Sequence, residues 1–372
     1  MRFATYVWIV ALLVFLPLMG LTLSAISFPA YTGVLTRIGG FSEDDFGWRK
    51  PQQVFSSQLF KIAKSADEYT RYYDVVVIGD SFSHDREKGW QNHFVEQTGL
   101  SVITFHHNVP LDTVLNAKVF KNSPPLFFVV ESLEQFSLSR FIAYNIYNSA
   151  AVADANSVST EVVTFVRQEL EKEQISNYSK VSIEELISQR SHNLIKAFER
   201  YRRPAEWLEG LKQLHGLGEH YALNKAYPLP LREGLKLFSN KLDDLLLVYG
   251  MDLTKVTEGV LLQDAANGVR RLHDKVEGNG HTRFILMIFP DKLSVYAPML
   301  KDETLAPPSL IPPLAQHFPS QLRLDLAFQQ ALDKPVVDLY LPNDTHAGFE
   351  GYRIAADVMI DYLITNGMAQ YR

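Results

Sequence analysis

Five short runs rich in β-branched and aromatic residues constrain the fold of this chain more than any other feature. Each run has the length and composition of a buried strand in a parallel sheet. The runs are 74–78, 101–105, 126–130, 283–289 and 335–339. Segments of helical length separate them, and this alternation predicts a parallel sheet with helices on both faces. We therefore expect an α/β fold with three layers.

The first run stops at a Gly-Asp-Ser turn, in the sequence VVVIGDSFSHD from Val75 to Asp85. Ligands of open α/β sheets gather at the carboxyl ends of the strands, so Ser81 has the placement of a nucleophile. The same serine is also suited to cap a helix, because Ser and Asp are preferred at helix N-termini. A base and an orienting carboxylate elsewhere in the chain would favour the nucleophile.

Asp344 and His346 are the candidates for these two roles. They follow the last predicted strand, in the sequence VVDLYLPNDTHAGFEGY, and so lie on the same rim as Ser81. Asp344 is close enough in the chain to hold the imidazole of His346 from the same loop. An amphipathic helix is predicted next, with its apolar face formed by Phe349, Tyr352, Ala356, Met359 and Tyr362 or Leu363. The two loops together favour Ser81 as nucleophile, His346 as base and Asp344 as its orienting acid.

Other histidines offer alternatives to His346. His106 and His107 end the second run near the same edge and are its main rivals as base, while His84 could line the site. The chain has no cysteine, and its histidines and carboxylates lack metal-ligand spacing, so we expect neither a metal nor a cofactor. The net charge of −6 and the lack of a basic run or Gly-rich phosphate loop argue against nucleic-acid binding.

The N-terminus predicts a membrane anchor. No charged residue or histidine occurs from Phe3 to Thr36, and 6–28 is long enough to cross a bilayer. The positive charges ahead of this run, Arg2 and the amino terminus, orient the remainder outside the cytoplasm. The sequence LSAIS is a poor cleavage site, which favours an uncleaved signal-anchor over a cleaved signal peptide.

Composition along the chain predicts four parts. A transmembrane signal-anchor, 1–29, is followed by an extracytoplasmic arm, 30–70, which is rich in glycine and aromatic residues. The catalytic domain comprises 71–149 and 281–372, interrupted by a helical insertion at 150–280. The sequence SIEE within this insertion is a capping box that opens a predicted helix.

Two short motifs carry a resemblance to a known family. GDSFS at 79–83 and DTH at 344–346 resemble the serine and histidine blocks of SGNH/GDSL hydrolases. The chain is more closely similar to the AlgX/AlgJ-like alginate O-acetyltransferases, since FPDKLSVYAPML at 289–300 and the anchored N-terminus also resemble segments of that family. The resemblance implies an SGNH-like, flavodoxin-like α/β/α domain. It leaves the helical insertion unmatched.

The sequence departs from the family at several points. Here the serine block precedes the Asp-Thr-His block, whereas the alginate proteins have the reverse order, and Ala347 replaces a usual aromatic residue. The third run continues as VVESLEQF, without the Gly-x-Asn-Asp block that supplies an oxyanion asparagine. As substitutes at the oxyanion and substrate site we expect the Ser81 N–H, the Asn108 side chain and Gly79.

These features lead to a functional expectation. The resemblance implies an O-acetyltransferase of the cell inner membrane, single-pass, with its catalytic domain in the periplasm. It would add acetyl groups to a cell-envelope or secreted polysaccharide through an acyl-serine, with a membrane-bound O-acyltransferase as partner and acetyl donor. Two alternatives stay open: a carbohydrate O-acetyl esterase with the same triad, and a catalytically inactive glycan-binding assembly protein.

Overall fold

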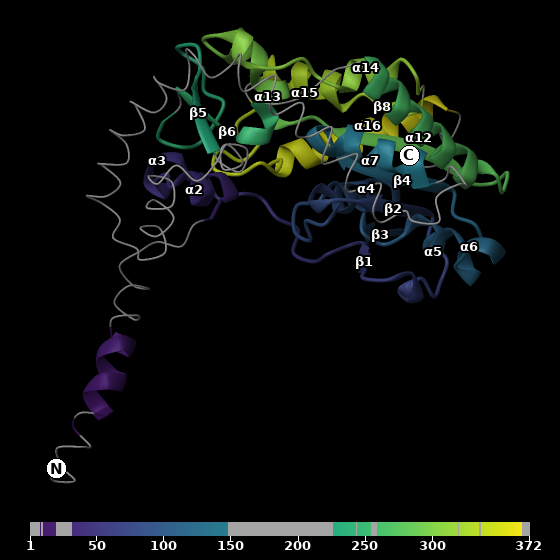
Figure 1. Ribbon diagram of the computed structural model, residues 1–372, viewed down its shortest axis with the longest axis horizontal. Helices are drawn as coiled ribbons and strands as arrows, with labels where there is room; N and C mark the ends of the chain where they lie inside the picture. Colours follow the sequence, from purple (N-terminus) through teal and green to yellow (C-terminus); the bar gives the residue numbers. More distant parts are fainter. Residues whose placement is uncertain are drawn as a thin grey trace.

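A six-stranded parallel sheet forms the centre of the computed structural model (Figure 1). The structure describes residues 8, 10–19, 32–147, 226–242, 244–253, 259–318, 320–334 and 336–366. The strand order is β1-β3-β2-β4-β7-β8, and each adjacent pair is parallel. The strands are β1 (Lys61–Ala63), β2 (Val75–Gly79), β3 (Val102–His106), β4 (Phe127–Leu133), β7 (Arg283–Phe289) and β8 (Gln321–Leu322). The predicted α/β fold with a parallel sheet is confirmed.

Helices cover both faces of the sheet because successive strand side chains point in opposite directions. Val75 and Val77 of β2 pack into one core, and Val76 and Ile78 pack into the other. The first core includes α4 (Trp90–Thr98), α13 (Lys292–Tyr296), α15 (Leu324–Leu332) and α16 (Phe349–Thr365). The second includes α5 (Leu111–Leu115), α6 (Lys118–Asn122), α7 (Glu134–Tyr147), α12 (Gly259–Glu277) and α14 (Ile311–Ala315). The central strands are therefore buried on both sides, as the apolar runs predict.

The strand order places a topological switch point at the carboxyl end of β2. From β2 the chain passes to β3 on one side and then crosses to β4 on the other. Ligands of doubly wound sheets bind in the crevice at such a point. Ser81 follows β2 directly, in a short 3₁₀ helix, η2 (Ser81–Ser83). The topology therefore brings this serine to the favoured binding edge.

Four of the five predicted strands form, but the fifth is wrong. Residues 336–339 form no strand, and Tyr340 makes only an isolated bridge with Ala347. Asp338 has a left-handed backbone conformation (φ 60°), which interrupts an extended strand. The edge strands are instead β1 and β8, of three and two residues, which are too short to give a periodic pattern.

The arm packs on a second, two-stranded sheet. Helices α2 (Val34–Gly39) and α3 (Glu43–Phe46) share a small core with the antiparallel strands β5 (Ala226–Pro230) and β6 (Leu245–Tyr249). These strands differ from the helices expected for 150–280, because prolines in AYPLP exclude a regular helix. Residues 148–225, with the predicted capping box, lie outside the described residues. The last part of the expected insertion, α12, belongs to the main fold, where it packs against α7 and β7.

The apolar N-terminal run is described in part. Residues 10–19 are helical, and their large apolar side chains are exposed, with Leu13 the most exposed at 70%. Within the described ranges, no helix combines the length and the hydropathy needed to cross a bilayer. Most of the remainder of the predicted signal-anchor lies outside the described residues.

The α16 core face yields a stability prediction. Met359 of α16 is fully buried against the sheet, so Met359→Ala should leave a cavity and lower the free energy of unfolding by about 2–5 kcal/mol. Asp361→Ala, two residues further on and exposed, should change it by less than about 0.5 kcal/mol. Chemical denaturation of both variants measures the difference. Equal losses would mean that α16 does not pack as described.

Candidate active site

A tight turn presents the Ser81 hydroxyl to solvent. Asp80 caps η2, and its side chain accepts a hydrogen bond from the Phe82 N–H at 3.0 Å. Ser81 is exposed, whereas Asp80, Phe82 and Ser83 on either side of it are buried. The capping role considered for Ser81 therefore belongs to Asp80. The serine itself is accessible to a substrate.

His346 and Asp344 complete a chain of hydrogen bonds to this serine. His346 Nε2 lies 2.9 Å from Ser81 Oγ, and His346 Nδ1 lies 2.6 Å from Asp344 Oδ1. The His346 backbone N–H also donates to Asp344 Oδ1 at 3.1 Å. The structure therefore brings together the three residues that the sequence places on two distant loops. Their order is that of a nucleophile, a base and an orienting carboxylate.

The surroundings of the triad suit these roles. Burial alone would raise the pKa of Asp344, but the hydrogen bond and charge of His346 outweigh it and lower that pKa to about 2. Burial likewise opposes the charged form of His346, yet the hydrogen bond and charge of Asp344 raise its pKa above the ordinary value. The ring of Phe82 lies against that of His346, with centroids 4.9 Å apart. His346 is thus held in place and has an increased affinity for a proton, as a general base requires.

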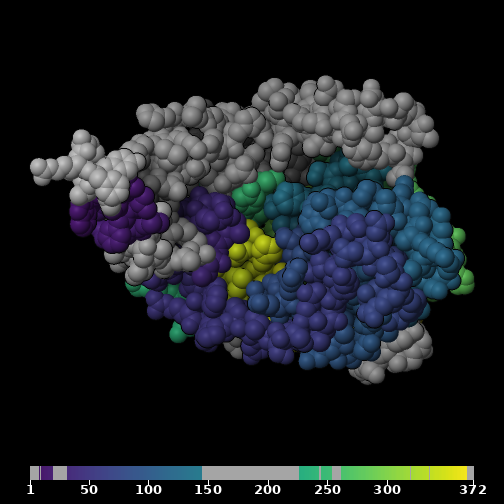
Figure 2. All heavy atoms as spheres, turned by 90° about the horizontal axis from the view of Figure 1, so that it is seen from below, coloured from purple at the N-terminus to yellow at the C-terminus, as the bar shows by residue number. Residues whose placement is uncertain are grey.

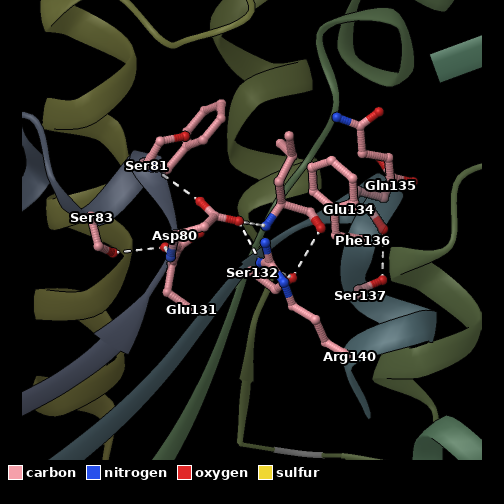
Figure 3. A network of polar contacts seen from close by, with 12 residues as sticks. Asp80, Ser81, Ser83, Glu131, Ser132, Glu134, Gln135, Phe136, Ser137 and Arg140 are labelled. Atoms are coloured by element: carbon pink, nitrogen blue, oxygen red, sulfur yellow. Dashed lines mark hydrogen bonds and ion pairs between the residues drawn. The ribbon is translucent and has the colours of Figure 1, made fainter. Parts of the chain in front are cut away.

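An ion pair between Asp80 and Arg140 holds the serine turn against α7. In Figure 3 the carboxylate of Asp80 lies between the serine turn and Arg140 of α7, with an oxygen–nitrogen distance of 2.5 Å. The same carboxylate accepts from the Leu133 N–H at 2.8 Å, and Arg140 donates to Ser132 Oγ at 2.8 Å. Burial would raise the pKa of Asp80, but Arg140 outweighs it and lowers that pKa. Asp80 is therefore an ionised anchor of the turn.

A second buried carboxyl, which was not predicted from the sequence, lies under the turn. Glu131 of β4 accepts hydrogen bonds at Oε2 from the Asp80 N–H (2.9 Å) and Ser83 Oγ (2.8 Å). Burial and the neighbouring Asp80 raise the pKa of Glu131 well above its ordinary value. A Cβ on Gly79 would overlap Glu131 Oε2, so only glycine fits there. Gly79, predicted at the substrate site, thus makes room for Glu131.

The arm holds the loop that carries the triad acid and base. The Val34 N–H donates to Asp344 Oδ2 at 2.9 Å, and the Leu35 N–H donates to the Asn343 carbonyl at 3.0 Å. Asn343 Nδ2 donates in turn to Thr32 Oγ1 at 2.6 Å. Figure 2 shows the C-terminal part of the chain, in yellow, beside the arm, in purple. The carboxylate of Asp344 is therefore held by His346 on one oxygen and by the arm on the other.

The rival histidines form a separate group on the same rim. The rings of His84 and His106 are 5.1 Å apart, and those of His106 and His107 are 4.1 Å apart, centroid to centroid. No ring nitrogen of these three residues is hydrogen-bonded to Ser81. Burial lowers the pKa of His107 to about 4, with a contribution from Arg140. Of the four histidines on this rim, His346 is the one that is hydrogen-bonded to Ser81.

The predicted oxyanion donors have no partners among the described residues. Asn108 is exposed on the turn after β3, and its side-chain amide donates to no described residue. The Ser81 N–H also has no acceptor in the described part of the chain. Both groups are available to a ligand, and their role as oxyanion donors stays a prediction. Over the same residues, no group of three or more histidines and carboxylates is arranged to hold a metal ion.

Comparisons of the chain with protein-family models, curated proteins and solved structures found no match.

The contact between the arm and the loop can be tested at Gly33. A Cβ at this position would overlap the Asn343 carbonyl, so Gly33→Ala should push the arm away from Asp344. A displacement of about 1 Å in a catalytic group can cost about 100-fold in rate, and we expect a loss of that order in kcat/KM for an acetyl ester. The control is Ile38→Ala, which weakens the packing of α2 without touching the loop. If Gly33→Ala retained as much activity as Ile38→Ala and the wild type, the arm would not support the triad.

Proposed function

We propose that this protein is a serine acyltransferase with an SGNH-like catalytic domain. The observation that carries the proposal is the chain of hydrogen bonds from the exposed Ser81 through His346 to Asp344. Its position at the switch point of a parallel sheet adds support, because this is where such folds bind ligands.

The proposed reaction has two halves. His346 takes the proton of Ser81 as Oγ attacks the carbonyl carbon of an acyl ester. The bond from that carbon to the leaving oxygen then breaks, and His346 returns the proton to the leaving group. In the second half His346 takes a proton from an acceptor hydroxyl as its oxygen attacks the acyl carbon. The bond from that carbon to Ser81 Oγ then breaks, and His346 returns the proton to Oγ, which restores the free hydroxyl. The Ser81 N–H and Asn108 would stabilise the oxyanion in each half.

The resemblance of the motifs supports acetyl as the acyl group and a cell-envelope or secreted polysaccharide as acceptor. A membrane-bound O-acyltransferase would be the partner that supplies the acetyl group. The exposed apolar side chains of residues 10–19 support an anchor in the inner membrane, with the catalytic domain in the periplasm. The runner-up is a carbohydrate O-acetyl esterase, in which water replaces the sugar hydroxyl. The hydrogen bonds that link Ser81, His346 and Asp344 favour the acyltransferase or the esterase over an inactive glycan-binding protein.

Acylation of Ser81 is the decisive test. We expect p-nitrophenyl acetate to add one acetyl group to the peptide that contains Ser81, as measured by mass spectrometry. Ser81→Ala should abolish acylation of this peptide, because it removes the oxygen that is acylated. His346→Ala should lower the rate of acylation by about 10⁴-fold or more, because it removes the base that activates this oxygen. His106→Ala and His107→Ala serve as controls and should retain acylation. Loss of acylation in these controls alone would move the role of base to the β3 rim.

Transfer and hydrolysis differ in the fate of the acetyl group. An enzyme that positions its acceptor gains an effective molarity of about 10⁵ M or more over free water, so transfer should dominate once acceptor is bound. We expect an envelope-derived oligosaccharide to accelerate turnover of acetyl-Ser81 and to appear as its acetyl ester. Release of acetate alone, at a rate independent of the oligosaccharide, would instead establish the esterase.

A further inference from the structure

Lys292 is a buried lysine directly beneath the loop of the triad. It is the first residue of α13, and only 2% of it is exposed. Its Nζ donates to the backbone carbonyls of Leu341 (2.8 Å), Pro342 (2.9 Å) and Asp344 (3.2 Å). All three acceptors belong to the loop that carries Asp344 and His346. Nothing in the reaction described above uses this side chain.

The number of acceptors indicates the protonation state of Lys292. A lysine ammonium has three N–H donors, whereas the neutral amine has two. Three carbonyls in hydrogen-bond range therefore match the ammonium and leave none of its donors unused. Loss of the proton would leave one buried carbonyl without a donor, and an unsatisfied buried acceptor is costly.

The surroundings of Lys292 favour and oppose its charge at the same time. Burial lowers the pKa of Lys292 to about 7, although the negative charges of Asp344, Asp252 and Asp338 raise it. Asp252 lies in η3 (Gly250–Leu253), and Asp338 precedes the loop. The face of the Phe238 ring lies 5.1 Å from Nζ and adds a cation–π contact. With a pKa of about 7, the ammonium is partly populated at neutral pH and is lost as the pH rises further.

We propose that Lys292 is a positioning residue whose ammonium locks the loop of Asp344 and His346, and that loss of its proton sets the alkaline limit of activity. The proposal rests on the proposed function, since it concerns the same site. Its physical basis is that the ammonium is the shared donor of three loop carbonyls, including that of the triad acid. When the loop is released, the hydrogen bond from the Ser81 hydroxyl to His346 loses its alignment.

Deprotonation of Lys292 cannot lower activity at alkaline pH by unfolding the protein. The pKa of the folded amine lies below the ordinary value of 10.5, so between about pH 7 and 10.5 the unfolded chain binds more protons at this site. Through this group the free energy of unfolding therefore rises with pH over that interval. A fall in activity there with no fall in stability points to the loop.

The first experiment compares pH profiles of kcat/KM for p-nitrophenyl acetate in the full chain. We expect the wild type to lose activity on an alkaline limb, while protonation of His346 sets the acidic limb. Lys292→Met keeps the bulk and removes the charge, so kcat should fall about 100-fold at the optimum, KM should change little and the alkaline limb should vanish. Lys334→Met, at an exposed lysine, is the matched control and should behave as the wild type. A wild-type profile in Lys292→Met would overturn the proposal.

A rescue experiment uses the lack of cysteine in this chain. Lys292→Cys can be alkylated with 2-bromoethylamine in the unfolded state and refolded, which places a thioether analogue of lysine at this position alone. The sulfur lowers the intrinsic pKa of the amine, so activity should return with an alkaline limb at lower pH than in the wild type. Recovery with an unshifted limb would show that another group sets it.

A readout independent of activity separates this proposal from the proposed function. The short hydrogen bond from His346 Nδ1 to Asp344 should give a downfield proton resonance in NMR spectra. We expect this resonance in the wild type and in Lys334→Met, its loss from the wild type over the pH range of the alkaline limb, and its absence from Lys292→Met. Its persistence in Lys292→Met would overturn the role of Lys292 even if Ser81 is acylated. If Ser81 is not acylated, the resonance still tests the loop while the proposed function fails.

Discussion

The hydrogen bond between Asp344 and His346 depends on a loop that has no regular secondary structure to hold it. Loop carbonyls and carboxylates that are removed from water need donors, and here several of these donors come from other parts of the chain. The ammonium of Lys292 supplies three of them from below, and backbone N–H groups of the arm supply others from the side. The base is thus positioned by contacts that the loop cannot make within itself.

The nucleophile is held by a different arrangement, built on two buried carboxyls with opposite properties. Asp80 is paired with Arg140 and stays ionised, whereas burial and the charge of Asp80 favour the neutral form of Glu131. Two adjacent buried carboxylates would repel each other, so the ionised form of Asp80 favours the protonated, neutral form of Glu131. Together they fix the serine turn through the N–H groups of Asp80 and Phe82 and leave Ser81 exposed.

The parts of this site that could be predicted from the sequence are those that follow from local pattern. Ser81 ends an apolar strand run, and Asp344 and His346 share one loop before an amphipathic helix, so all three could be placed on one rim. The contacts of Val34 and Lys292 could not be predicted, because their partners lie 310 and about 50 residues away and many are backbone groups without a sequence signature. The failed strand at 336–339 has the composition of a strand, but the left-handed conformation of Asp338 is set by tertiary contacts with Ser239 and Gln52.

The arm connects the apolar N-terminal run directly to the loop that carries the triad acid and base. The uncharged run continues to Thr36, and Val34 within it already donates to the carboxylate of Asp344. The structural support of the triad therefore begins only a few residues after the apolar run of 6–28, at Thr32 and Gly33. An N-terminal truncation that removes the apolar run but retains Thr32 keeps these donors. A truncation that also removes Val34 leaves Asp344 Oδ2 without the N–H donor of Val34. Such a truncation should disturb the alignment of His346 more than the packing of the sheet.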